Sequence, residues 1–438
     1  MALGLNGALG RVGAIIWPIA ALLASTALMV TGNGMQMLVL PLRAQAEHFP
    51  PLMIGLLGTG YFLGFTVGCL AGPRLIAAVG HIRTYAALVS LTVVVVLALS
   101  LLVTPVTWVA GRFVTGLCVA GLSLVLESWL HDQATPATRG VVMSSYVAIN
   151  LTVITVGQLL AARFDPAGFT LFALMAILLS LAALPVTLTR ATQPAPLLAV
   201  RLRPRFLYAL SPAGFVSIFG IGLANGAFWG LAPVVVQTAS GSMTFVASFM
   251  SAAVLGGALV QAPLGQLSDR LDRRRIAQML SLLSAALALL VALVLGLGQS
   301  GAGALLLAML FGAVTLPGYA VIAAHVFDLA SRDDMVEVSA GLLLTNALGA
   351  AAGPLLASAL MTAMGNLWGF ALFTAVAQLA VFTYLRHRLA ITPSPAPADK
   401  AQFDFSATAP VLSGPVDEAR GEAGEAPGDP GQADSPAA

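Results

Sequence analysis

The sequence predicts an all-α membrane protein of twelve transmembrane helices, arranged as two pseudo-symmetric six-helix bundles. Composition, the length of the apolar runs and an internal duplication lead to this prediction. Of the 438 residues, 58% are hydrophobic and only 9% are charged, and the mean hydropathy is +0.93. A soluble domain carries about 25% charged residues. Lipid must therefore be the solvent for most of this chain.

The apolar runs follow one another from about residue 13 to residue 388. Each is long enough for the ~20 residues that a spanning helix needs. Barrel strands alternate apolar and polar residues over ~10 positions, so these solidly apolar runs exclude an outer-membrane barrel. The first run is too long for the apolar part of a signal peptide and has no small-residue cleavage site, so we count it as a helix. The predicted helices lie near 13–41, 51–73, 84–104, 106–130, 139–162, 168–188, 212–237, 243–265, 276–297, 302–327, 336–363 and 367–387.

The second half of the chain repeats the first. At a shift of 192 residues Asn33 falls on Asn225, and at a shift of 196 residues Asn150 falls on Asn346. Supersecondary repeats recur every 20–50 residues, so a repeat of this length is a whole domain. Two repeated sets of hydrophobic helices are typical of a membrane transporter. We predict an N-terminal bundle over 1–189, a cytoplasmic linker over 190–210, a C-terminal bundle over 211–388 and a disordered cytoplasmic tail over 389–438, whose composition cannot form a core.

Basic residues predict the orientation. If the N terminus is cytoplasmic, Arg43 and Arg163 lie outside and Arg112 lies within a helix, which leaves seventeen of the twenty Lys and Arg residues inside. The positive-inside rule therefore favours this topology. We expect a multi-pass protein of the inner (plasma) membrane with both termini in the cytoplasm.

A sequence motif stands between the eighth and ninth predicted helices. Gly265 is followed by Asp269 and Arg270, and a basic run follows them. This segment resembles the signature loop of the major facilitator superfamily, G-x-x-x-D-R-x-G-R-R, although Asp272 stands where the family has Gly. The resemblance covers residues about 13–388 and is to bacterial permeases of unassigned substrate.

That resemblance implies a conformational latch formed by Gly265, Asp269, Arg270, Arg273 and Arg274, which would lock the outward-open state. We expect the eighth helix to end at Gly265, and Asp269 to pair with a nearby Arg or to lie at a helix N terminus. In the first half, Ala77 replaces Asp269, so the latch is expected only in the second half.

Arg112 is the clearest charged residue within a predicted span. A charge at the bilayer centre costs at least ~2.5–3.5 kcal/mol on insertion scales. Helical spacing places Gly116 and Glu127 on the same face as Arg112, and Glu127 lies about 22 Å further along the axis, too far to pair with it. We expect this face to line a central cavity, where Arg112 binds an anionic group of the substrate or tunes a carboxylate. A structural ion pair or a snorkelling side chain is the alternative.

Glu127 lies near Arg139 at the cytoplasmic end of the fourth helix. Both a salt bridge that closes an inner gate and a proton-carrying role are consistent with this position. Glu337 holds the related position in the second half and is expected to meet the region of Asp269.

Uncharged polar residues supply the other cavity candidates. Symmetric asparagines near a repeat interface are where a midplane site is expected, although buried asparagines also hold helices together at about 0.6 kcal/mol per hydrogen bond. The substrate-cavity candidates beside Arg112 are Asn33, Asn225, Trp229, Tyr146, Asn150 and Asn346. Weaker candidates are Gln36, Gln261, Tyr61, Tyr319 and His325.

Several function classes are excluded by what the sequence lacks. The only lysine is Lys400, so a phosphate-binding G-x-x-x-x-G-K-[ST] loop is impossible. Five scattered histidines and two cysteines within apolar runs form no metal-ligand pattern. We expect no enzyme activity, no cofactor and no nucleic-acid partner.

The sequence therefore predicts a monomeric secondary transporter that moves a small organic solute by alternating access, with proton-driven export favoured and facilitated diffusion left open. Its partners would be the solute, protons and the lipid bilayer. The alternative is a membrane sensor or assembly scaffold that has kept the fold and signals through its tail.

Overall fold

The computed structural model describes residues 16–135, 138–189, 194, 203–331 and 334–392, and helices connected by short loops make up this part of the chain. The elements are η1 Trp17–Ile19, α2 Ala20–Ala46, α3 Pro51–Val79, α4 His81–Leu101, α5 Pro105–Gln133, α6 Arg139–Ala161, α7 Phe169–Thr187, α8 Pro204–Leu210, α9 Pro212–Ser240, α10 Met243–Arg270, α11 Arg273–Gly296, α12 Ala302–Thr315, α13 Gly318–Phe327, α14 Met335–Met364 and α15 Trp368–Ile391.

Twelve helical segments of the described chain are long and apolar enough to cross a membrane, which confirms the predicted number. The tenth of them is broken, because α12 ends at Thr315 and α13 begins at Gly318. Pro317 lies at this break, and a proline cannot donate the backbone hydrogen bond that would continue the helix.

The predicted end of the eighth helix was wrong. Helix α10 passes through Gly265 and ends at Arg270, because a glycine ends a helix when it adopts a left-handed conformation, and Gly265 does not. Within the predicted linker, residues 204–210 form the short helix α8. Helix α15 reaches Ile391, beyond the predicted start of the tail. The rest of that tail lies outside the described residues.

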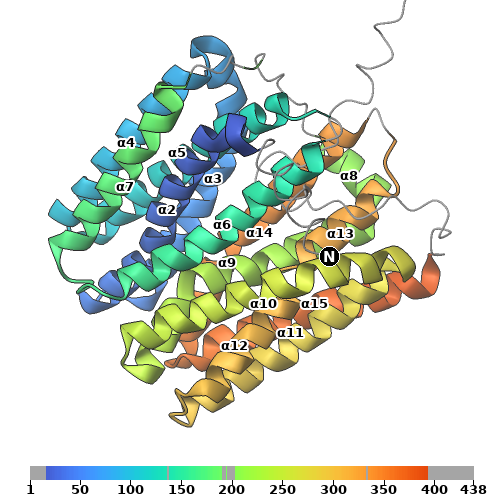
Figure 1. Ribbon diagram of the computed structural model, residues 1–438. Helices are drawn as coiled ribbons and strands as arrows, with labels where there is room; N and C mark the ends of the chain where they lie inside the picture. The colour runs from blue at the N-terminus through green and yellow to red at the C-terminus, as the bar shows by residue number, and fades with distance from the viewer. Residues whose placement is uncertain (1–15, 136–137, 190–193, 195–202, 332–333, 393–438) are drawn as a thin grey trace, which may run out of the picture.

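Helices η1–α7 form one lobe and helices α8–α15 the other, which we call the N-lobe and the C-lobe. In Figure 1 the blue and green N-lobe lies beside the yellow and red C-lobe. The same helix pairs contact in both lobes. The contact of α3 with α5 corresponds to that of α10 with α12, α2 with α6 to α9 with α14, and α4 with α7 to α11 with α15. The sequence duplication is thus also a duplication of packing.

Glycine makes the closest of these contacts possible. Gly64 in α3 lies against Phe113 in α5, and a Cβ atom at Gly64 would collide with the Phe113 carbonyl. In the C-lobe a Cβ atom at Gly256 would collide in the same way with the carbonyl of Met309. Small residues allow such close helix approach within a membrane.

The two lobes are joined mainly toward one end. We call the end with Arg74, Arg139 and Arg270 the basic end and the other the far end. One hydrophobic core spans the N-lobe and the far-end half of the C-lobe. A second core, which includes Ile218 and Leu385, belongs to the basic-end half of the C-lobe alone.

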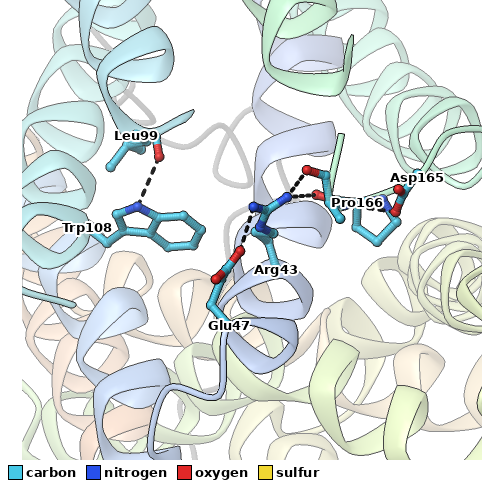
Figure 2. A network of polar contacts seen from close by, with 7 residues as sticks. Arg43, Glu47, Leu99, Trp108, Asp165 and Pro166 are labelled. Carbon is cyan, nitrogen blue, oxygen red and sulfur yellow. Dashed lines mark hydrogen bonds and ion pairs between the residues drawn. The ribbon is translucent and has the colours of Figure 1, made fainter. Parts of the chain in front are cut away.

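A polar network closes the far end of the N-lobe (Figure 2). Arg43 at the end of α2 pairs with Glu47 at 2.5 Å and donates hydrogen bonds to the carbonyls of Pro166 and Ala167 in the α6–α7 loop. Nearby, the indole of Trp108 donates to the carbonyl of Leu99 at 3.0 Å. The first group of contacts ties the end of α2 to the α6–α7 loop, and the second ties the start of α5 to the end of α4.

Candidate functional site

Arg112 lies about two turns into α5, a helix whose first residue is Pro105 and whose N-cap is Thr104. Arg112 is only 4% exposed. The guanidinium donates from Nη1 to Oε1 of Gln36 at 3.2 Å and from Nη2 to the sulfur of Met37 at 3.3 Å. Its central carbon lies 4.2 Å from the centre of the Tyr61 ring, an arrangement that favours a cation.

The same cluster includes Asn33, one of the predicted cavity residues. The Tyr61 hydroxyl and the Asn33 amide are hydrogen-bonded at 3.4 to 3.5 Å. Helices α2, α3 and α5 therefore each contribute a polar side chain to one buried group. Gln36 and Tyr61 were among the weaker cavity candidates, and Gln36 follows Asn33 by about one helical turn.

A pocket opens beside this cluster at the junction of the lobes. It is lined by Met37, Pro41, Leu57, Gly58, Phe62, Arg112, Trp229 and Gly230. Trp229 and Gly230 belong to the C-lobe helix α9, and the other residues belong to the N-lobe. The pocket is thus built from both halves of the duplication.

The lobes touch each other next to this pocket. A Cβ atom at Gly58 would lie 3.0 Å from the ring of Pro354 in α14 and 3.4 Å from Cα of Gly230. The Thr59 hydroxyl donates across the same junction to the carbonyl of Ala351 at 2.8 Å. Near the far surface, Gln45 donates to the Thr238 hydroxyl at 2.7 Å. The pocket therefore lies at the level where the lobes are in contact.

Glu127 belongs to a different group of residues. It is fully buried in α5, and the hydroxyl of Tyr146 in α6 donates to its Oε1 at 2.8 Å. Asn150 donates to the backbone carbonyl of Tyr146 at 2.9 Å, within its own helix. Glu127, Tyr146 and Asn150 are not among the residues that line the pocket. The helix face that was expected to carry both Arg112 and Glu127 into one cavity therefore places them in two separate groups. Arg139 is the first residue of α6, at the basic end.

The symmetric asparagines of the C-lobe lie in helices that pack against each other, α9 and α14. Asn225 and Asn346 are each partly exposed. The amide oxygen of each is buried and accepts no hydrogen bond from the described residues. They are therefore not joined to one another, unlike Asn33 and Tyr61 in the N-lobe.

The predicted latch residues lie at the basic end of the C-lobe. Asp269 pairs with Arg273 at 3.1 Å, and Arg273 also pairs with Asp328 at the end of α13, at 2.9 Å. Arg274 pairs with Asp272 at 2.9 Å. Gly265 is buried and Arg270 is exposed.

The expectation for Glu337 was wrong. Its carboxylate pairs with Arg203, which precedes α8, at 3.4 Å, rather than with the region of Asp269. The competing partner, Arg203, lies in the linker, whose path the helix pattern could not predict.

Comparisons with known proteins agree on one family. The family profile described as "Major Facilitator Superfamily" matches residues 22–213 and again residues 210–416. The uncharacterized MFS-type transporter YcaD of Escherichia fergusonii is 25% identical over 337 residues, which cover 76% of this chain and 86% of that protein. An uncharacterized MFS-type transporter of Yersinia pestis has the same identity and coverage.

Solved structures show the same fold. The nucleoside transporter NupG has a TM-score of 0.66 at 12% identity, and the match covers 86% of this chain and 100% of that one. A bacterial homologue of the human lysosomal transporter Spinster, in an inward-facing and unoccupied conformation, has a TM-score of 0.66 at 14% identity, covering 91% of this chain and 97% of that one.

Proposed function

The chain belongs to the Major Facilitator Superfamily, and from this premise we propose that it moves a small organic solute across the inner membrane by alternating access, with the pocket beside Arg112 as the solute site. The single observation that carries the proposal is the position of this pocket. It is built from both lobes and lies where they touch. A rocking of one lobe on the other would therefore change access to it, as alternating access requires.

The positive-inside rule supports a cytoplasmic location for the basic end. The C-lobe has a core of its own at that end, whereas its far-end half shares a core with the N-lobe. We therefore propose that this is an inward-facing state, closed toward the outside by the contacts of Gly58 with Pro354 and of Gln45 with Thr238.

We further propose that the solute is exported in exchange for protons, and that Glu127 carries the proton. A carboxylate buried within a span is costly unless it has a role, and Glu127 is bound by a hydroxyl donor, Tyr146. When the far end opens, Glu127 would have to become accessible to protons from outside the cell. The latch set around Asp269 joins α10, α11 and the end of α13 within the C-lobe in this state, so we propose that these pairs rearrange when the opposite state forms.

Reconstitution of the full chain in liposomes tests the transport proposal. The probes are radiolabelled monocarboxylates, nucleosides, sugars and organic cations. We expect saturable uptake of at least one class, accelerated by an acidic lumen. Glu127→Gln should retain solute exchange but lose the acceleration by protons, because an amide does not bind and release a proton as a carboxylate does. Uptake no faster than in protein-free liposomes for every class would contradict transport. Equal acceleration of Glu127→Gln and the unaltered chain would contradict the role of Glu127.

A further inference from the structure

Arg112 differs from the other buried arginines in the described part of the chain. Three arginines are buried there, namely Arg112, Arg273 and Arg274. The latter two each pair with a carboxylate, at 2.9 Å in both cases. Arg112 has a neutral amide, a thioether and an aromatic ring as its partners, and no ion pair with a described residue is formed.

A guanidinium has five N–H donors, and only two of the hydrogen bonds of Arg112 are made within the described chain. A buried charge without a counter-ion is strongly unfavourable. Arg112 also lines the pocket. The pocket beside the guanidinium has a volume of about 10 Å³ in this state, room for about one water, so a larger counter-ion binds there only when the lobes move apart at this level.

The C-lobe has no matching charge. At the repeat shift of 196 residues Arg112 corresponds to Ala308, and at 192 residues Gln36 corresponds to Phe228. Both C-lobe residues are buried. Phe228 lines a wholly apolar cavity together with Phe249 and Phe311. The N-lobe thus has a polar, cationic cluster where the C-lobe has an aromatic one.

The rest of the Arg112 pocket is also apolar. Its wall consists of Met37, Leu57 and Phe62 from the N-lobe and Trp229 from α9. The Trp229 ring is held edge-on by Phe228, with 5.5 Å between the ring centres. A bound molecule would therefore meet one positive group and, around it, aromatic and aliphatic surface.

We propose that the pocket recognises a monoanionic organic solute with an apolar body, such as an aromatic carboxylate, whose acid group pairs with Arg112 and whose body packs on Trp229. This inference rests on the proposed function, because it names the substrate class of the same site. A carboxylate fits the planar fork of a guanidinium with two parallel hydrogen bonds. The single charge follows from the single cation, and the apolar body follows from the wall.

Binding to the detergent-solubilised full chain tests the proposal with defined probes. Benzoate is compared with benzamide, which has the same body and no charge, with benzylamine, which is cationic, and with chloride and inorganic phosphate, which are anions without a body. We expect benzoate to bind more tightly than each of the others. Arg112→Gln should weaken benzoate binding by about 30-fold or more, the loss typical when one partner of a buried charge pair is removed.

Two further variants act as controls. Arg163→Gln makes the same change at an exposed arginine of the same lobe and should leave benzoate binding unchanged. Arg112→Lys keeps the charge without the fork and should bind benzoate more tightly than Arg112→Gln. If Arg112→Gln does not fold, the preference of the unaltered chain for benzoate over benzamide and the behaviour of Arg112→Lys still decide the question.

The proposal is wrong if benzamide, benzylamine or the inorganic anions bind as well as benzoate, if no probe binds, or if Arg112→Gln binds benzoate like the unaltered chain. Saturable uptake of a neutral or cationic solute into liposomes would then leave transport standing and remove only this substrate class. Absence of uptake for every class would instead contradict transport itself.

Discussion

Arg273 is held by carboxylates from two other helices, Asp269 in α10 and Asp328 after α13. The side chains of Arg273 and Asp328 are each only 1% exposed. At the repeat shifts, the corresponding N-lobe residues are Ala77, His81 and Asp132. There, His81 packs edge-on against Trp129 instead, with 6.2 Å between the ring centres. The buried Arg273–Asp328 ion pair of the C-lobe thus has at its N-lobe position a histidine that packs on an aromatic ring.

Removing one partner of the buried pair should strongly destabilise the C-lobe. We expect Arg273→Ala to lower the free energy of unfolding by about 3–5 kcal/mol, because it leaves the buried Asp328 carboxylate without its counter-ion. The check is the melting temperature of the purified protein. Arg275→Ala, at an exposed neighbour, is the control and should change it little.

A double variant separates charge pairing from packing. Replacing Arg273 and Asp328 together by Leu removes both buried charges and should recover much of the stability lost in Arg273→Ala. Equal melting temperatures for Arg273→Ala and Arg275→Ala would show that the pair does not stabilise the fold.

At this scale the sequence predicted the unusual residues better than their partners. Arg112 and Glu127 stood out because charge is rare within a span. The pairing of Arg273 with Asp328 could not be predicted, because the two residues are far apart in sequence and lie in different helices. The pairing of Glu337 was predicted wrongly for the same reason, since its partner Arg203 lies in the linker.

The helix pairs α3–α5 and α10–α12 show why the duplicated glycines stand where they do. Gly64 meets Phe113, and its repeat counterpart Gly256 meets Met309. Phe113 and Met309 are themselves counterparts at a shift of 196 residues. The two contacts are therefore the same backbone approach, preserved in both lobes.

A single methyl group at either glycine should disturb this approach. We expect Gly64→Ala and Gly256→Ala each to lower the free energy of unfolding by about 1–3 kcal/mol, the usual cost of overpacking. Gly303→Ala provides the control, because a Cβ atom there meets no heavy atom within 4 Å, and its higher helix propensity favours alanine. Thermal melting of the three variants checks the prediction, and similar melting temperatures for all three would contradict it.

The number of helices and their approximate limits followed from hydropathy, because a span must satisfy its backbone hydrogen bonds within itself. Helix ends near the motif did not follow. Gly265 was taken as a helix end, but α10 continues to Arg270 and the next helix starts after Asp272, whose carboxylate caps it by accepting from the amide of Arg274 at 2.9 Å. The position of a cap depends on such local contacts, which hydropathy does not contain.

For the molecule as a whole, the contacts between the lobes are unequal at its two ends. The helices that meet across the lobes include α3 with α14, α6 with α10 and α2 with α9. The printed sequence predicted two related bundles, but it contained no sign of which end is closed. That choice depends on small differences in free energy between two packings of the same helices.

Joining the lobes at the far end should stop transport if that end must open during the cycle. Gln45 and Thr238 are hydrogen-bonded across the lobes at 2.7 Å, so cysteines at both positions are within reach of a short, cleavable bis-maleimide. Cys69 and Cys118 are replaced by Ala in this variant. We expect cross-linking to abolish solute flux in liposomes and cleavage of the linker to restore it.

The control pair carries cysteines at Arg43 and Ala167, which are in contact at the same end but within the N-lobe. Its cross-link adds the same chemical group without joining the lobes, so flux should continue. Loss of flux in both pairs would indicate damage to the far end rather than arrest of the cycle. Unchanged flux in the Gln45–Thr238 pair would mean that solute passes without separation of the lobes there, because a covalent link of this length resists the opening that alternating access demands.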